Sequence, residues 1–127
     1  MKRKAMLWAA MAAAVPMLGV SQSSSNGKNT SISGWVIDSS CAYTKGLEKP
    51  ISMACAKACA KSGSPLVILR DDGAIFLPID SKTPASSQND KLLPFAGEHV
   101  KVSGTEYAHG DSHAIVIASI APDLCAG

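Results

Sequence analysis

The sequence predicts a small, mainly β domain in which five short strands close into a barrel, with a helical insertion after the first strand. Apolar runs rich in Val, Ile and Leu recur along the 127-residue chain and are bounded by Gly, Pro, Asp and Ser, as in short strands separated by turns. One alanine-rich stretch, residues 50–62, has the composition and spacing of a helix instead. Closing the sheet would remove the exposed strand edges of so small a domain, so we expect a barrel.

The first strand is predicted over residues 31–38, where the run from Trp35 to Ile37 supplies β-prone side chains. A polar turn is expected over residues 39–49. The helix 50–62 opens with a proline, which fits the first helical position, and Gly63 stands where a C-terminal cap is expected. This helix would place four residues on one face: Ile51, Cys55, Cys59 and Ser62.

A hairpin is predicted next, because residues 66–69 and 74–77 are apolar and flank Asp71-Asp72-Gly73. An Asp-Gly pair favours a tight turn, since glycine tolerates the positive φ that such turns require. Residues 79–97 are expected to form a polar connection with a short helical turn near Leu92.

Two strands over residues 99–107 and 114–120 are predicted to flank a turn at residues 109–112. The resulting order is strand, helix, hairpin, connection and hairpin, with a Gly-x-x-Val-x-Val-x-Gly pattern in the closing pair. This order resembles an OB-like barrel. An open five-stranded sheet packed by one helix is the alternative.

The N-terminal segment has the three parts of a secretory signal peptide. Three cations at positions 2–4 precede an uncharged stretch, residues 5–20, and a Ser-rich exit follows with cleavage expected after Ser21 or Ser23. A membrane anchor is the alternative, but the apolar stretch is shorter than the roughly 20 residues that cross a bilayer. We therefore expect a signal peptide over 1–21, a disordered tether over 22–30, a domain over 31–127, and export to the periplasm or the extracellular space.

The basic charge belongs to the predicted signal peptide. The whole chain is +2, but three of its twelve cations lie in residues 2–4, which leaves nine against ten acidic residues. Scattered cations and few aromatic residues argue against nucleic-acid binding. After cleavage, no further membrane span is expected.

The four cysteines, Cys41, Cys55, Cys59 and Cys125, are expected to form disulfides, because export delivers them to an oxidising compartment. Cys55 and Cys59 are one helical turn apart, with Cβ atoms about 5–6 Å from each other, whereas a disulfide requires roughly 3.5–4.5 Å. Each is therefore expected to pair with Cys41 or Cys125. Two alternatives stay open: a copper or zinc site using Cys41, Cys55, Cys59 and Met53, and a thiol oxidoreductase, although the chain has no Cys-x-x-Cys motif.

The spaced motifs resemble a family of small exported bacterial proteins of unknown function. They are Gly34-Trp35-Val36-Ile37-Asp38 followed by Cys41, the pair Cys55 and Cys59, Pro65-Leu66-Val67, and residues 97–104. The resemblance covers most of residues 32–120. It implies that cysteines occur more regularly at the positions of Cys41, Cys55 and Cys59 than at the position of Cys125. This would favour one disulfide plus a free thiol or metal ligand. It implies no activity and no catalytic residue.

No catalytic constellation is predicted. His109 and His113 bracket a turn with Asp111 between them and are expected to be solvated rather than metal-bound, and His99 is expected at a surface or rim. Asp71 and Asp72 are interpreted as turn formers. The sequence thus predicts a non-enzymatic, cofactor-free binding or structural domain that contacts a protein or small ligand near Tyr43, residues 79–93 and residues 108–113.

Overall fold

A computed structural model describes residues 13–14, 27–48 and 50–124. Apart from residues 13–14, the predicted signal peptide lies outside the described residues. So do positions 22–26 of the predicted tether and Cys125.

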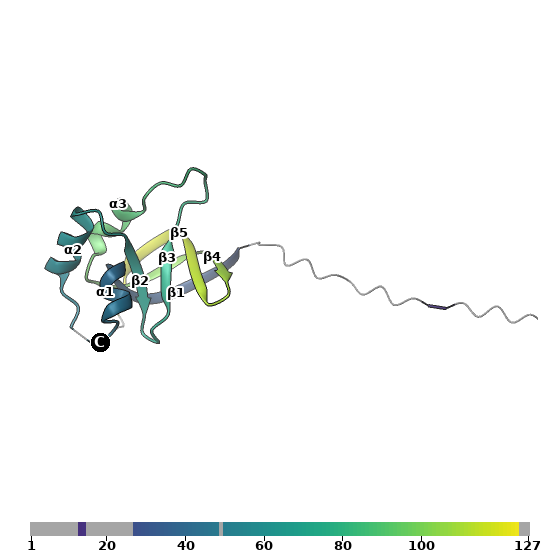
Figure 1. Ribbon diagram of the computed structural model, residues 1–127, viewed down its shortest axis with the longest axis horizontal. Helices are drawn as coiled ribbons and strands as arrows, with labels where there is room; N and C mark the ends of the chain where they lie inside the picture. The colour runs from purple at the N-terminus through teal and green to yellow at the C-terminus, as the bar shows by residue number, and fades with distance from the viewer. Residues whose placement is uncertain (1–12, 15–26, 49, 125–127) are drawn as a thin grey trace, which may run out of the picture.

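The domain consists of a five-stranded barrel with three short α-helices and one 3-10 turn (Figure 1). In chain order the elements are β1 (Lys28–Asp38), α1 (Ser39–Thr44), α2 (Met53–Lys61), β2 (Leu66–Arg70), β3 (Ile75–Pro78), α3 (Asn89–Leu92), the 3-10 turn (Leu93–Phe95), β4 (His99–His109) and β5 (Ser112–Pro122).

The sheet closes in the order β1-β2-β3-β5-β4, with β1 hydrogen-bonded to both β2 and β4. Only the β3–β5 contact is parallel; the other described pairs are antiparallel. The OB-like barrel is therefore confirmed, and the open sheet is wrong. The Asp-Gly hairpin is also confirmed, since Gly73 has a φ of 90° between β2 and β3.

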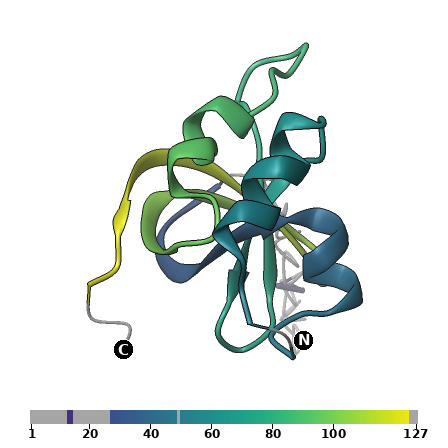
Figure 2. The same cartoon turned by 90° about the vertical axis from the view of Figure 1, so that its left-hand side faces the viewer.

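The barrel interior is filled by alternate side chains of the strands, with the largest fully buried one from Phe76. Leu92 from α3 and Ala56 and Ala60 from α2 complete this core. The two helices lie at the same end of the barrel (Figure 2). A second, smaller cluster lies on the outer face of β1 and β2, where Ala42 of α1 covers Val67. All four apolar residues of β2 are consequently buried, because its two faces pack against different layers.

Three predicted boundaries differ from the structure. α1 occupies part of the predicted polar turn, because the Asp38 side chain caps it by accepting hydrogen bonds from two backbone amides. β1 begins at Lys28 rather than at residue 31, since residues 28–30 pair with β4. α2 begins at Met53 rather than at residue 50, after an N-cap at Ser52.

The face predicted to hold Ile51, Cys55, Cys59 and Ser62 is not the one that packs on the core, and Ile51 and Ser62 lie outside α2. Ala56 and Ala60 face the core, while Cys55 is exposed and Cys59 is half-buried beside them. In the described part of the chain, no helix is long and apolar enough to cross a membrane.

Candidate functional site

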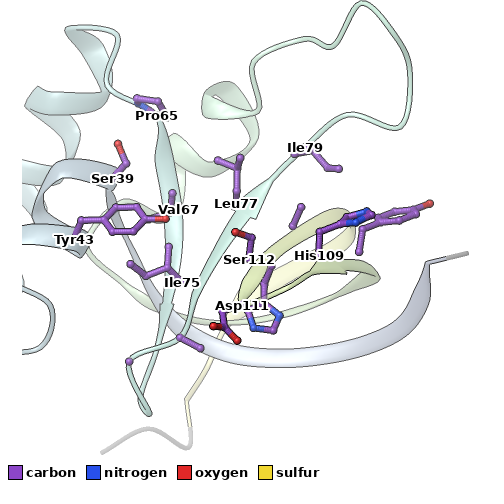
Figure 3. Close-up of a pocket in the computed structure, with 15 residues that line it drawn as sticks. Ser39, Tyr43, Pro65, Val67, Ile75, Leu77, Ile79, His109, Asp111 and Ser112 are labelled. Atoms are coloured by element: carbon purple, nitrogen blue, oxygen red, sulfur yellow. The ribbon is translucent and has the colours of Figure 1, made fainter. Parts of the chain in front are cut away.

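A groove of about 940 Å³ lies over the outer face of β3, and we call it the outer groove (Figure 3). Its floor is apolar. It comprises Pro65, Val67, Ala74, Ile75, Leu77 and Ile79, with Ala114 of β5 beside them.

The groove exists because α1 covers β2 but stops short of β3. In β3, Phe76 and Pro78 point into the barrel, so Ile75 and Leu77 point outward. On β2 the outward residues are buried beneath α1, whereas Leu77 remains 45% exposed. The apolar outer face of β3 is thus left uncovered, next to the outer face of β2, which α1 covers.

Polar side chains from separate elements border this floor. Ser39 and Tyr43 of α1 lie on one side and His109 lies on the other. Ser112, the first residue of β5, lies between them, with Asp111 of the β4–β5 turn below it (Figure 3). Tyr43 is 76% exposed, which leaves its ring available to a ligand. Two of the three regions predicted to contact a partner, Tyr43 and residues 108–113, therefore meet at one groove.

Only the beginning of the third predicted contact region takes part. Ile79 lines the outer groove, but Leu92 is buried in the barrel core. Asn89 in the same region is structural: its side chain accepts a hydrogen bond from the Leu66 amide at 2.9 Å and donates one to the Ser64 carbonyl at 2.8 Å.

Two of the three histidines are held by carboxylates. His113 Nδ1 lies 2.7 Å from Glu106 Oε1, and its ring stacks on Phe76 at 4.9 Å between centroids. The expectation that His113 is solvated is therefore wrong.

His99 has a side chain only 7% exposed, with ring nitrogens 3.0 Å from Asp71 and 3.3 Å from Asp123, so it is not a surface residue.

A second, smaller hollow of about 270 Å³ lies between α1 and α2, and we call it the thiol cavity. Cys41 and Lys45 line it from the α1 side, and Cys55 lines it from α2. Cys41, Cys55 and Cys59 all carry free thiols. The structure thus brings together three of the four cysteines singled out in the sequence without bonding any two of them.

Asp38 organises this region. Its carboxylate is buried and accepts hydrogen bonds from the amides of Ser40 and Cys41 at 3.1 and 3.3 Å and from the Ser64 hydroxyl at 3.1 Å. Burial raises the pKa of Asp38, but these hydrogen bonds and one from the Cys41 thiol outweigh it, so the pKa lies below the ordinary 3.8.

The same carboxylate disfavours the thiolate forms of its neighbours. The hydrogen bond to Asp38, together with burial and the Asp38 charge, raises the pKa of Cys41 to about 11. Burial, the Asp38 charge and a hydrogen bond with Cys55 raise the pKa of Cys59. An activated nucleophilic thiol needs the opposite environment. Asp38 was not singled out in the sequence, although an Asp directly before a Ser-Ser pair is a recognisable helix cap.

Met53 does not join the cysteines. Its backbone and side chain lie against Gly97, and it is not among the residues that line the thiol cavity. Over the part of the chain that the structure describes, no group of three or more His, Cys, Asp or Glu side chains is arranged to hold a metal ion.

Comparison of the chain with protein-family models, curated proteins and solved structures gives no match. The barrel is established by the strand order alone, and the family resemblance stays a prediction.

Proposed function

We propose that the protein is an exported, non-enzymatic domain that binds a small ligand with an apolar body and polar edge groups in the outer groove, and that a disulfide stabilises it. The observation that carries the binding role is the groove itself. Small-molecule sites are concave, about 300–1,000 Å³ in volume, and mostly apolar with a few placed polar groups. The outer groove has about 940 Å³, an apolar floor and polar groups at its borders.

Its location supports the same role. Barrels of this strand order bind ligands over the faces of strands 2 and 3 and at the loops that follow strands 1 and 4. Here α1 lies in the connection after β1, and residues 110–111 form the connection after β4. This is an analogy between folds, which supports a binding site without identifying its ligand.

Binding rather than catalysis is favoured by how the titratable groups are used. His113 lines the groove, but its Nδ1 already pairs with Glu106 at 2.7 Å and its ring stacks on Phe76. His109 and Ser112 face each other as a strand pair in the β4–β5 hairpin, in a position to contact a ligand's polar edge.

The proposal is tested with the amphipathic fluorophore anilinonaphthalene sulfonate, whose fused rings match the apolar floor. Leu77→Ser removes the most exposed part of this floor. Because Leu77 is half-exposed, its lost contact is worth about 1 kcal/mol, which corresponds to roughly fivefold weaker binding.

Leu47→Ser is the matched control, since Leu47 is 42% exposed and is not among the groove residues. It should leave the dissociation constant unchanged. Amide chemical-shift changes should centre on residues 74–79 and 112–114. Equal weakening by both substitutions, or shift changes elsewhere on the domain, would reject the outer groove as the binding site.

A further inference from the structure

Of the three thiols in the described chain, Cys55 is the one placed next to both of the others. It lines the thiol cavity together with Cys41, and Cys59 lies one turn further along α2. Cys55 is also the exposed one of the three. Any oxidant therefore reaches Cys55 first, with two candidate partners beside it.

Helix geometry separates the two partners. Cys59 lies one turn along the same helix, where Cβ atoms stand about 5–6 Å apart, and a disulfide between them would unwind α2. Cys41 lies on α1, across the thiol cavity from Cys55. α1 and α2 are separate helices, so a bond between Cys41 and Cys55 would not have to span one turn of a single helix.

α1 also forms a wall of the outer groove. Ser39 and Tyr43 line the groove, while Cys41 and Lys45 line the thiol cavity, so one six-residue helix separates the two hollows. It is attached to the barrel through Ala42, its one buried residue, and through Cys41, which packs against the same cluster. The Ser39 amide also donates to the Pro65 carbonyl at 2.9 Å.

We propose that Cys41 and Cys55 form a reversible disulfide across the thiol cavity, and that this bond orders α1 and thereby sets the affinity of the outer groove. The second clause rests on the proposed binding function. The first concerns the thiols alone. Cys59 is left as a thiol beside the bond.

The oxidant is a small disulfide such as oxidised glutathione. The Cys55 thiolate attacks one of its sulfurs, and the first glutathione thiolate leaves and takes up the proton that Cys55 released. The Cys41 sulfur then attacks the Cys55 sulfur of the mixed disulfide, and the second glutathione leaves with the Cys41 proton. Two protein thiols are oxidised to one disulfide, and one glutathione disulfide is reduced to two thiols.

Exposure fits this order of attack. Cys55 is the accessible sulfur, whereas the hydrogen bond to Asp38 raises the pKa of Cys41 and makes it the poorer first nucleophile. Asp38 is thus a positioning residue, which holds the Cys41 side chain through the cap of α1.

The full chain, exported and purified without reductant, is equilibrated in glutathione buffers of increasing oxidised fraction and digested for peptide mapping. The expected product links Cys41 to Cys55 and is two hydrogens lighter than the reduced protein. A Cys55–Cys59 or Cys41–Cys59 link, a link to Cys125, thiols that stay reduced in fully oxidised buffer, or copper or zinc held by the three thiols would each overturn the proposal.

Hydrogen exchange of the α1 amides tests the ordering of the helix without any ligand. Oxidation should slow it by about tenfold, as expected when a bond suppresses local opening. Cys41→Ser and Cys55→Ser should abolish the difference, while Cys59→Ser, the matched control, should keep it. Equal exchange in the oxidised and reduced wild-type protein would refute the coupling even if a variant fails to fold.

Anilinonaphthalene sulfonate is then titrated into both redox forms. We expect the oxidised form to bind about fivefold more tightly, since Tyr43 is ordered beforehand. Equal affinity in the two forms would refute redox control of the groove. If neither form binds the fluorophore but the disulfide and the slowed exchange are observed, the proposed binding function fails while the switch stands.

Discussion

Asp38 supports α1, and replacing it should destabilise the domain in a pH-dependent way. Asp38→Ala removes a helix N-cap, which costs about 0.5–2 kcal/mol. It also removes the carboxylate that accepts the Ser64 hydroxyl, a bond to a charged group worth about 1.5–3 kcal/mol. The expected loss is therefore about 2–5 kcal/mol of unfolding free energy at pH 7.

Asp38→Asn should cost about half as much, because one oxygen remains as an acceptor. Oδ2 receives the Ser40 amide and the Ser64 hydroxyl, and Oδ1 receives the Cys41 amide, so an amide group can satisfy only part of this set. The matched control is Asp90→Asn, which changes an exposed Asp of α3 and should leave stability nearly unchanged.

The pH dependence follows from the lowered pKa of Asp38. A carboxyl with a folded pKa below its unfolded value of about 3.9 stabilises the protein above that value. This contribution is lost as the pH falls through the folded pKa. The stability gap between wild type and Asp38→Asn should consequently be full at pH 7 and narrow below about pH 4.

Urea denaturation followed by circular dichroism, at pH 7 and at steps down to pH 3, measures both effects. Iodoacetamide labelling of Cys41 gives an independent readout, since removing the carboxylate removes the largest cause of its raised pKa and should speed alkylation. The assigned role of Asp38 would be refuted if Asp38→Asn were as stable as the wild type at pH 7. It would also be refuted if the difference in unfolding free energy between the two proteins did not change with pH.

Three further predictions concern backbone packing, the loop and export. Gly97→Ala should lower the free energy of unfolding, measured by urea denaturation, by about 3–4 kcal/mol, because the added Cβ would lie 2.4 Å from Met53 Cα and the residue has a φ of 83°. The control Gly110→Ala, where φ is 58° but the surrounding space is open, should lower it by only about 1–2 kcal/mol. Asn89→Ala should cost about 2–3 kcal/mol by the same assay, since a buried β2 amide loses its acceptor; a change under 0.5 kcal/mol would contradict this. The intact mass of the exported protein should correspond to a chain starting at Gln22 or Ser24, and retention of the whole N-terminal segment would contradict cleavage.

Strand positions and turns were predictable because they depend on local sequence. The alternation in residues 99–107, the Asp-Gly pair before Ala74 and the helical turn near Leu92 each reflect short-range steric and hydrogen-bonding preferences. α1 was missed because six residues are too few for an amphipathic period, and its signal is confined to the cap at Asp38. The start of β1 at Lys28 was missed because polar residues there pair with β4, far away in the chain.

The sequence by itself determined the order of strands and helices along the chain, the helical insertion after the first strand, and the presence of three thiols in two neighbouring segments. The tertiary structure alone decided what those residues face. Barrel closure turned Leu77 outward beside a helix too short to cover it, which made a groove of an apolar strand. It also placed Cys41 and Cys55 around one buried carboxylate. Such meetings depend on how helices cross the surface of a sheet, and contacts between separate elements leave no periodic trace in the sequence.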